Sequence, residues 1–155
     1  MRLWRLTRAA YQRLDGEGAR LNGGRWNSEG NAVVYLSSTL SLAALELLVH
    51  VDLEDAPRDL VALAVDLPDD IGMQSVDPSD LPDDWRDVPD HPACVARGDA
   101  WLAAGDALLL RVPSAVIPDE MNYLLNPRHA GAATATISPA SPFEFDPRLV
   151  VRFGG

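Results

Sequence analysis

A short β-branched run followed directly by an apolar helix pattern constrains the fold of this chain more than any other feature. The run "AVVYLS" (32–37) predicts a buried strand. Ser38 or Thr39 can then cap a helix over residues 40–52, "LSLAALELLVHVD". Because apolar side chains occur all the way round this segment, we expect a helix buried inside a domain.

Other short runs indicate an α+β fold class with short strands and two or three helices around a central cleft. Further strands are predicted at 1–7, 60–65, 107–118 with a kink at Pro113, 133–138 and 148–153. Further helical segments are predicted at 92–105, from Pro92 to the stop at Gly105, and at 119–127.

The 155 residues have the length of one domain, and we expect a single domain over 1–155. Within it, residues 66–92 form an excursion rich in Asp and Pro, which predicts turns. Ile71 and Trp85 are the side chains expected to anchor this excursion to the core.

The charge and composition exclude several classes of function. A formal net charge of −10 repels phosphate backbones, so we expect no direct binding to nucleic acid, whereas a basic protein partner would suit it. No apolar run approaches the roughly 20 residues of a membrane span, and no signal peptide is apparent. The single cysteine, Cys94, and three histidines are poor material for a disulfide or a zinc site. We therefore expect a cytoplasmic protein without a metal.

Residues 15–31 are dense in glycine, yet Arg25 and Trp26 lie in their middle. Gly23 and Gly24 permit positive φ and a close approach of the backbone to another molecule. An arginine presented there suits bidentate contact with a phosphate or carboxylate. The alternative is an ordinary surface loop in which Trp26 covers the core.

Several polar side chains admit both a structural and a functional interpretation. Glu46 and His50 interrupt the apolar helix on one face, either as a solvated stripe or with the carboxylate directed into a cleft. Tyr35 alternates with Val33 and Ser37 on one face of its strand, and a core tyrosine bonded to a backbone carbonyl is the plainer interpretation.

Three segments together resemble a known family. They are "LWRLT", "GEGARLNGGRWNSEGNAVVYLSSTLSLAALELLVH" and "RVPSAVIPDEMNYLLNPRH". In this order they resemble the RES domain family, named for an arginine, a glutamate and a serine, which would here be Arg25, Glu46 and Ser114. The resemblance covers nearly the whole chain, although 66–92 contributes little to it.

The resemblance implies the toxin half of a bacterial toxin–antitoxin pair, with a fold like that of ADP-ribosyltransferases. Such proteins attack NAD⁺, which would be the substrate, with no cofactor and with inorganic phosphate as a possible co-substrate. The partner would be an antitoxin that carries a helix-turn-helix DNA-binding region, occludes the active site and forms an oligomeric complex with the toxin. An exposed apolar patch near the cleft would show where that antitoxin docks.

The resemblance also implies a catalytic set of Arg25, Tyr35 and Glu46. Arg25 would bind the pyrophosphate of NAD⁺, with Arg5 as a second phosphate ligand. Tyr35 would stack on nicotinamide, and Trp26 is the alternative aromatic. Glu46 would bind a ribose hydroxyl and stabilise the positive charge that develops on the sugar.

Ser114 and Asn126 would position the amide or the ribose, although each also suits an ordinary turn. The acceptor of ADP-ribose is left open between phosphate, water and a target protein. A module that binds NAD⁺ or ADP-ribose without turnover is a further alternative.

Overall fold

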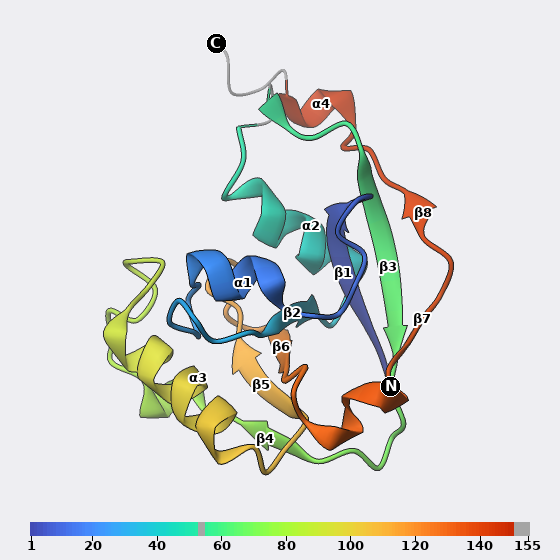
Figure 1. The fold of residues 1–155 in the computed structure, drawn as a ribbon. Helices are drawn as coiled ribbons and strands as arrows, with labels where there is room; N and C mark the ends of the chain where they lie inside the picture. Colours follow the sequence, from blue (N-terminus) through green and yellow to red (C-terminus); the bar gives the residue numbers. More distant parts are fainter. Residues whose placement is uncertain (53–54, 151–155) are drawn as a thin grey trace.

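The computed structural model describes residues 1–52 and 55–150 (Figure 1). Its strands are β1 Arg2–Arg8, β2 Val34–Ser37, β3 Leu60–Asp66, β4 Met73–Ser75, β5 Leu109–Pro113, β6 Met121–Leu125, β7 Thr136–Ile137 and β8 Ser141–Pro142. Its α-helices are α1 Glu17–Asn22, α2 Leu40–Leu48, α3 Pro92–Ala104 and α4 Pro147–Val150. 3₁₀ turns cover Pro78–Asp80 and Ala130–Thr134. The predicted α+β class is thereby confirmed, although the described residues contain four α-helices where two or three were predicted.

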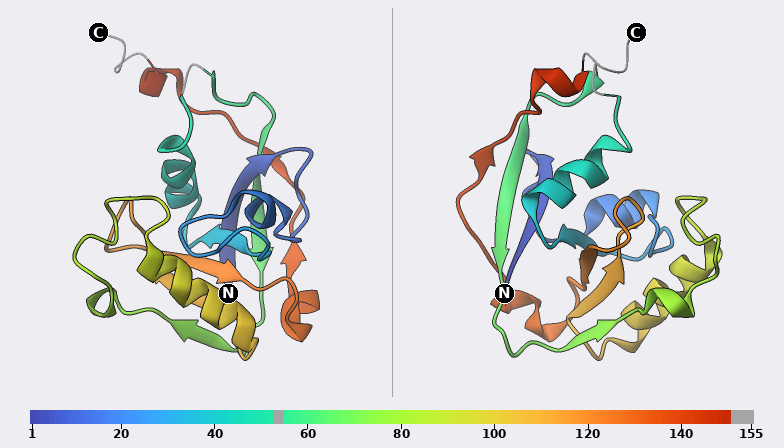
Figure 2. Two further views of the ribbon diagram at one scale, coloured as in Figure 1. Left: turned by 60° about the vertical axis from the view of Figure 1, so that its left-hand side comes forward. Right: turned by 180° about the vertical axis from the view of Figure 1, so that it is seen from behind.

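All eight strands belong to one mixed sheet in the order β4-β5-β6-β2-β1-β3-β7, with β8 also paired to β3. β4 and β5 are parallel, and the other pairings are antiparallel. β1 and β2 are paired at only one register position, Trp4 with Ser37, so the strand pairing of the sheet is shortest there. Figures 1 and 2 show that β1 and β3 run in a different direction from β5, on the other side of this narrow point.

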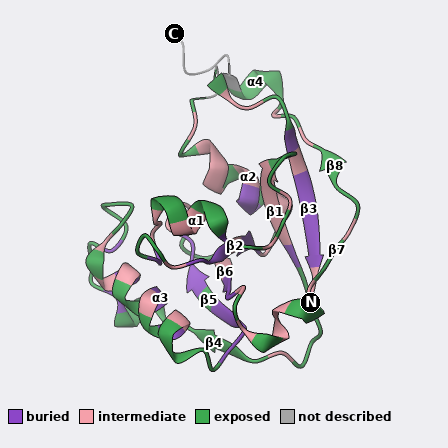
Figure 3. Cartoon of the chain, viewed as in Figure 1, coloured by how far each residue is buried: buried purple, intermediate pink, exposed green. Residues whose placement is uncertain are grey.

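The core divides between the two faces of the sheet, as alternation along β2 predicts. Val33 belongs to one hydrophobic cluster, with Tyr35 packed against it, and α3 covers that cluster with Cys94 and Trp101. Val34 and Leu36 belong to a second cluster, which includes residues of β1, β3, β5 and β6. Figure 3 shows the buried residues concentrated along these strands.

The helix predicted over 40–52 is confirmed as α2, although it ends at Leu48, and its complete burial is not confirmed. Thr39 caps α2 by accepting a hydrogen bond from the backbone N of Leu42 at 3.1 Å. Leu42 is fully buried, whereas Leu45 is 39% exposed and Val49 is 58% exposed. The reason is that α2 packs on β1 and β2 with one side, so an apolar strip remains on its other flank.

The predicted strands at 1–7 and 60–65 and the helix at 92–105 are confirmed as β1, β3 and α3. Gly105 ends α3 with a φ of 67°. The strand predicted at 107–118 is shorter and ends at Pro113.

The helical turn predicted at 119–127 is wrong, because β6 occupies its middle. Acidic residues at its start and a proline at its end resemble helix boundaries. However, β6 pairs with β2 on one side and with β5 on the other, and this pairing outweighs local propensity.

The C-terminal predictions hold only in part. At 133–138 a 3₁₀ turn precedes the two-residue β7. The strand predicted at 148–153 is wrong for residues 148–150, which are helical in α4, and 151–153 lie outside the described residues.

The acidic excursion is more ordered than turn signals alone indicate, because it contains β4 and a 3₁₀ turn. Trp85 is buried and Ile71 is half-buried, which confirms both as anchors, and Val76 and Leu81 are buried as well.

The glycine-dense segment packs tightly against α3 at Gly98. A Cβ atom at Gly98 would lie 1.7 Å from the carbonyl oxygen of Trp26. We expect Gly98→Ala to lower the free energy of unfolding by about 3 kcal/mol, the upper end for an overpacked core. The matched control is Gly18→Ala on α1, where no atom lies within 4 Å of the added Cβ. It should raise stability by up to about 1 kcal/mol. Urea unfolding measures both changes, and equal stability of the two variants would contradict this packing.

Candidate active site

The carboxylate of Glu46 reaches from α2 to the hairpin formed by β5 and β6. Its Oε1 atom accepts hydrogen bonds from Ser114 Oγ at 2.6 Å and from Asn122 Nδ2 at 2.5 Å. Glu46 is half-buried, so its side chain lies against the sheet and not free in bulk solvent. The structure thus brings Glu46 and Ser114 together from positions 68 residues apart in the chain.

Ser114 is fully buried, and all the hydrogen-bonding capacity of its hydroxyl is used. The Oγ atom accepts from the backbone N of Val116 at 3.1 Å and of Ile117 at 3.0 Å, and it donates to Glu46. These bonds fix the hydroxyl proton toward the carboxylate. Ser114 therefore holds Glu46. Its hydroxyl has no free donor or acceptor left for the predicted direct contact with substrate.

Tyr35 anchors the glycine-dense segment through its hydroxyl. The phenol oxygen accepts from the backbone N of Trp26 at 3.0 Å and donates to Asn27 Oδ1 at 2.7 Å. Burial raises the pKa of the Tyr35 phenol, so the group stays neutral. A Cβ at Gly24 would lie 2.6 Å from this hydroxyl, which explains why glycine is needed there.

Further polar contacts hold the same segment, which is therefore an ordered structure and not the flexible loop that its glycines indicate. Asn27 Nδ2 donates to the backbone O of Ala19 at 2.9 Å and of Asn31 at 3.1 Å. Asp99 of α3 accepts from the backbone N of Ser28 at 3.0 Å and from Asn31 Nδ2 at 2.8 Å. Desolvation opposes ionisation of Asp99, but the Ser28 hydroxyl, which also donates to this carboxylate, and these two donors outweigh it and lower the pKa of the carboxyl.

Arg25 is held by the acidic excursion. Its Nη1 atom donates to the backbone O of Trp85 at 2.8 Å and of Val88 at 3.0 Å, and its guanidinium lies 5.7 Å from the centre of the Trp85 ring. Burial raises the pKa of the nearby Cys94 thiol, and the charge of Arg25 partly offsets this. Because a guanidinium has five N–H donors, these two bonds do not use its whole donor set.

Trp26 is a core residue in this structure. Its side chain is 2% exposed and belongs to the cluster beneath α3, with its ring 6.3 Å from that of Trp85. A ring enclosed in this way offers no face for nicotinamide. Tyr35, the other aromatic candidate, packs against the same cluster but is only half-buried.

Asn126 and Arg5 are not brought together with Glu46. Asn126 is 4% exposed and its Oδ1 accepts from the backbone N of Arg128 at 3.0 Å, which is the turn interpretation of Asn-Pro. Trp4 pairs with Ser37, so alternation along β1 places Arg5 on the opposite face of the sheet from Ser37. There Arg5 Nη1 donates to the backbone O of Arg13 at 2.8 Å.

Sequence reasoning missed Asn122 and Ser37, which join the Glu46 cluster. Ser37 Oγ donates to Asn122 Oδ1 at 2.8 Å, and the two residues face each other across β2 and β6. Asn122 lies in a segment predicted to be helical. Had 121–125 been assigned as a strand paired with 34–37, alternation would have placed Asn122 on the Tyr35 and Ser37 face.

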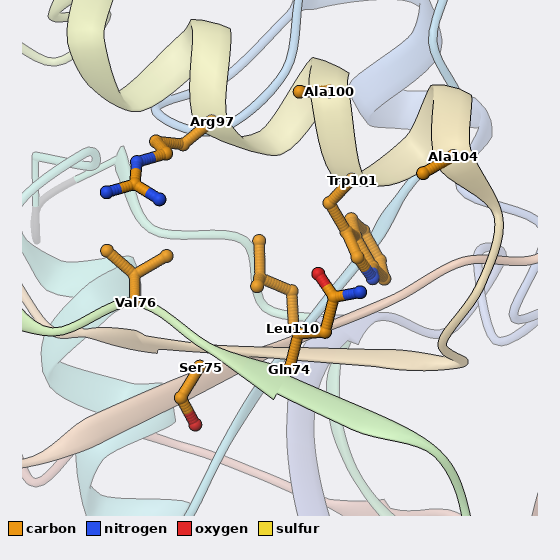
Figure 4. Close-up of a pocket in the computed structure, with 8 residues that line it drawn as sticks. All are labelled: Gln74, Ser75, Val76, Arg97, Ala100, Trp101, Ala104 and Leu110. Atoms are coloured by element: carbon orange, nitrogen blue, oxygen red, sulfur yellow. The ribbon is translucent and has the colours of Figure 1, made fainter.

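A cavity of about 210 Å³ lies between α3 and β4, away from Glu46 (Figure 4). It is smaller than typical ligand pockets of roughly 300–1,000 Å³. Trp101 lines it, and the Nε1 atom of Trp101 is buried without a partner among the described residues. The cavity is lined by none of the predicted site residues: its lining is Gln74, Ser75, Val76, Arg97, Ala100, Trp101, Ala104 and Leu110.

The anchoring role of Tyr35 can be tested by Tyr35→Phe. The change leaves the Trp26 N–H and Asn27 Oδ1 without this partner, so we expect a loss of about 1–3 kcal/mol in stability. The amide of Trp26 should exchange hydrogen faster than in the unaltered protein. Tyr11→Phe, at a tyrosine that is 62% exposed, is the matched control and should change stability by less than about 0.5 kcal/mol. Unaltered protection of the Trp26 amide would contradict the anchoring role.

Comparisons with known proteins show which family this chain belongs to. The RES domain matches residues 2–146. A Toxin Res of Yersinia enterocolitica is 38% identical over 153 residues, covering 96% of this chain and 99% of the relative. A Prs ADP-ribosylating toxin of Sphingobium is 33% identical, covering 88% of this chain and 86% of the relative.

The fold is also similar to that of a solved structure. A chain of the M. tuberculosis MbcT–MbcA toxin–antitoxin complex superposes with a TM-score of 0.76 at 21% identity, covering 96% of this chain and 86% of that chain. Among the described residues, no helix is long and apolar enough to cross a membrane. The extent of the domain match, together with relatives above 30% identity along most of the chain, shows that this protein belongs to the RES domain family.

Proposed function

We propose that this protein is the toxin of a toxin–antitoxin pair and that it cleaves the bond between nicotinamide and ribose in NAD⁺. Relatives named Toxin Res support the first part. The arrangement of Glu46 carries the second, because a carboxylate held at Oε1 by Ser114 and Asn122 is fixed in orientation before any substrate binds.

The chemistry needs such a group. Nicotinamide leaves as a neutral base from a cationic pyridinium, and the ribose passes through an oxocarbenium-like state with developing positive charge. The second oxygen of Glu46 would bind a ribose hydroxyl and stabilise this charge. Arg25 would bind the pyrophosphate with its remaining donors, and Tyr35 would lie beside nicotinamide. No cofactor is needed, because NAD⁺ is itself the substrate.

The acceptor distinguishes three versions of the reaction. We favour phosphorolysis, which gives nicotinamide and ADP-ribose-1″-phosphate, with hydrolysis to ADP-ribose as the close variant. Transfer of ADP-ribose to a protein is a second candidate, since one relative is named an ADP-ribosylating toxin. A binding module without turnover is the least favoured, because binding alone does not need a carboxylate oriented toward the ribose.

One experiment separates these versions. Purified protein is incubated with NAD⁺, with and without phosphate, and the products are identified by chromatography. We expect nicotinamide release that depends on phosphate. Release without phosphate would indicate hydrolysis, label on a second polypeptide would indicate transfer, and binding without release would indicate the module.

Glu46→Gln should keep the fold and lower kcat by about 10²–10³-fold, because the amide lacks the charge that stabilises the cation. Glu144→Gln, at an exposed glutamate, is the matched control and should retain full turnover. Thermal unfolding checks that both variants are folded. Turnover of Glu46→Gln equal to that of the control would refute the assignment of Glu46.

We further propose that the antitoxin covers the exposed strip of α2. Leu45 and the C-cap residue Val49 are four residues apart, so they lie on one face of α2, and Leu45 immediately precedes Glu46 in the chain. An exposed apolar strip next to the carboxylate would let a bound partner occlude the active site. The partner would be an antitoxin with a helix-turn-helix DNA-binding region, as the family resemblance implies.

The double substitution Leu45→Asp with Val49→Asp tests this docking surface. Two carboxylates in an apolar contact should weaken antitoxin binding by at least about tenfold, whereas NAD⁺ turnover should persist. Titration calorimetry measures binding of the antitoxin. Growth of cells that co-express toxin and antitoxin measures how far the antitoxin protects them. Leu21→Asp, at a leucine of α1 that is 58% exposed, is the control and should leave the affinity unchanged. Equal affinity of all three proteins would exclude this surface.

A further inference from the structure

Asn122 is bonded on both sides of its amide, and the family resemblance assigns it no role. Its Nδ2 atom donates to Glu46 Oε1 at 2.5 Å, and its Oδ1 atom accepts from Ser37 Oγ at 2.8 Å. Ser37 is 5% exposed. The three side chains thus form a line from the centre of the sheet to the carboxylate on α2.

The Glu46 carboxylate, which can only accept, selects the orientation of the Asn122 amide, and the Ser37 hydroxyl is compatible with that orientation. Turning the amide by half a rotation would exchange its oxygen and nitrogen and place Oδ1 against Glu46 Oε1. Two acceptors at that distance would repel each other. In the observed orientation the Ser37 hydroxyl meets the amide oxygen and the carboxylate meets the amide nitrogen, so each donor has an acceptor.

The backbone under this line is fixed by strand pairing. Asn122 faces Ser37 of β2 on one side and Val112 of β5 on the other. Ser37 in turn faces Trp4 of β1. A group that is held on central strands is positioned more exactly than one held on a loop, which matters when a carboxylate must meet a single ribose hydroxyl.

The hydrogen bonds to this carboxylate within residues 1–52 and 55–150 all end on Oε1. Oε2 therefore remains for another partner. We propose that Ser37 and Asn122 are positioning residues, which set the rotation of the Glu46 carboxylate so that Oε2 faces the ribose. This inference rests on the proposed function, since it assigns the ribose of NAD⁺ as that partner.

The decisive variant is Asn122→Asp, which keeps the shape of the side chain. At pH 8 the introduced carboxylate would repel Glu46, and we expect kcat about 100-fold below that of the unaltered protein. As the pH falls, one proton is shared between the two carboxyl groups. The protonated group can then donate to Oε1 as the amide does, so at pH 5.5 the loss should shrink to about tenfold or less.

A double substitution tests whether Asn122 acts through Glu46. In the Glu46→Gln background, adding Asn122→Asp should cause no further loss of kcat at pH 8. Ser37→Ala, which removes the hydrogen bond to the amide oxygen, should lower kcat by about two- to tenfold. Asn22→Asp on α1 adds the same charge at an exposed site and is the control, with turnover unchanged at both pH values.

A second readout does not depend on turnover. A like charge next to Glu46 raises the pKa of the introduced carboxyl in the folded state above its value in the unfolded chain. The variant should therefore have a lower Tm than the unaltered protein at pH 8 and recover as the pH falls. A constant difference in Tm would show that the two groups do not meet in solution, and it would overturn the inference.

The failures of the two proposals can be told apart. If the unaltered protein releases no nicotinamide, the proposed function fails, and the assignment of ribose to Oε2 fails with it. If the unaltered protein is active and Asn122→Asp matches it at both pH values, the positioning role fails while the proposed function stands. An equal loss in the presence and absence of Glu46 would also overturn the positioning role.

Discussion

The carboxylate of Glu46 accepts hydrogen bonds from two donors on one hairpin. Ser114 directly follows β5, and Asn122 lies in β6. A half-buried carboxylate is costly unless it is hydrogen-bonded, so these donors offset the loss of hydration. The same bonds attach α2 to the sheet on the side away from its contact with β1. The position of the helix and the orientation of its carboxylate therefore have one common cause, and the structure does not need a ligand to establish either.

The glycine-dense segment serves the core and presents Arg25 at the same time. Gly24 makes room for the Tyr35 hydroxyl, and Gly98 of α3 lets the Trp26 backbone approach. With Trp26 enclosed in the core, its neighbour Arg25 is directed to the acidic excursion, where two carbonyls and the Trp85 ring hold it. The two large side chains in this segment, Trp26 and Arg25, thus have different roles. The indole fixes the segment, and the guanidinium stays partly available for an anion.

How far the sequence predicts this arrangement depends on how far apart in the chain the interacting residues lie. Residues 32–52 carry a strand alternation, a cap at Thr39 and a helix pattern, and all three are local, so they were predictable. The exposure of Leu45 and Val49 was not, because apolar composition does not say which elements are near enough to cover a helix. Asn122 was missed since pairing of β6 with β2 and β5 outweighs local signals that resemble a helix. Arg25 and Glu46 were candidates from their own segments, family resemblance supplied their roles together with Ser114, and their contacts came only from the fold.

The division of labour in the proposed site follows from where the charge of the reaction develops. The cation on the ribose is common to attack by phosphate, water or a protein side chain, so stabilisation by Glu46 serves each of them equally. The groups that select phosphate, water or a protein side chain as the acceptor must then lie outside the line of Ser37, Asn122 and Glu46. A phosphate acceptor requires a cation near the ribose, and Arg5 does not meet this need because it lies on the other face of the sheet. Arg25, whose two hydrogen bonds to the acidic excursion both leave from Nη1, keeps other N–H donors for the pyrophosphate that the proposal assigns to it. On this argument the acidic excursion, which fixes Arg25, serves the binding of NAD⁺, and the choice of acceptor is separate from both Arg25 and the carboxylate.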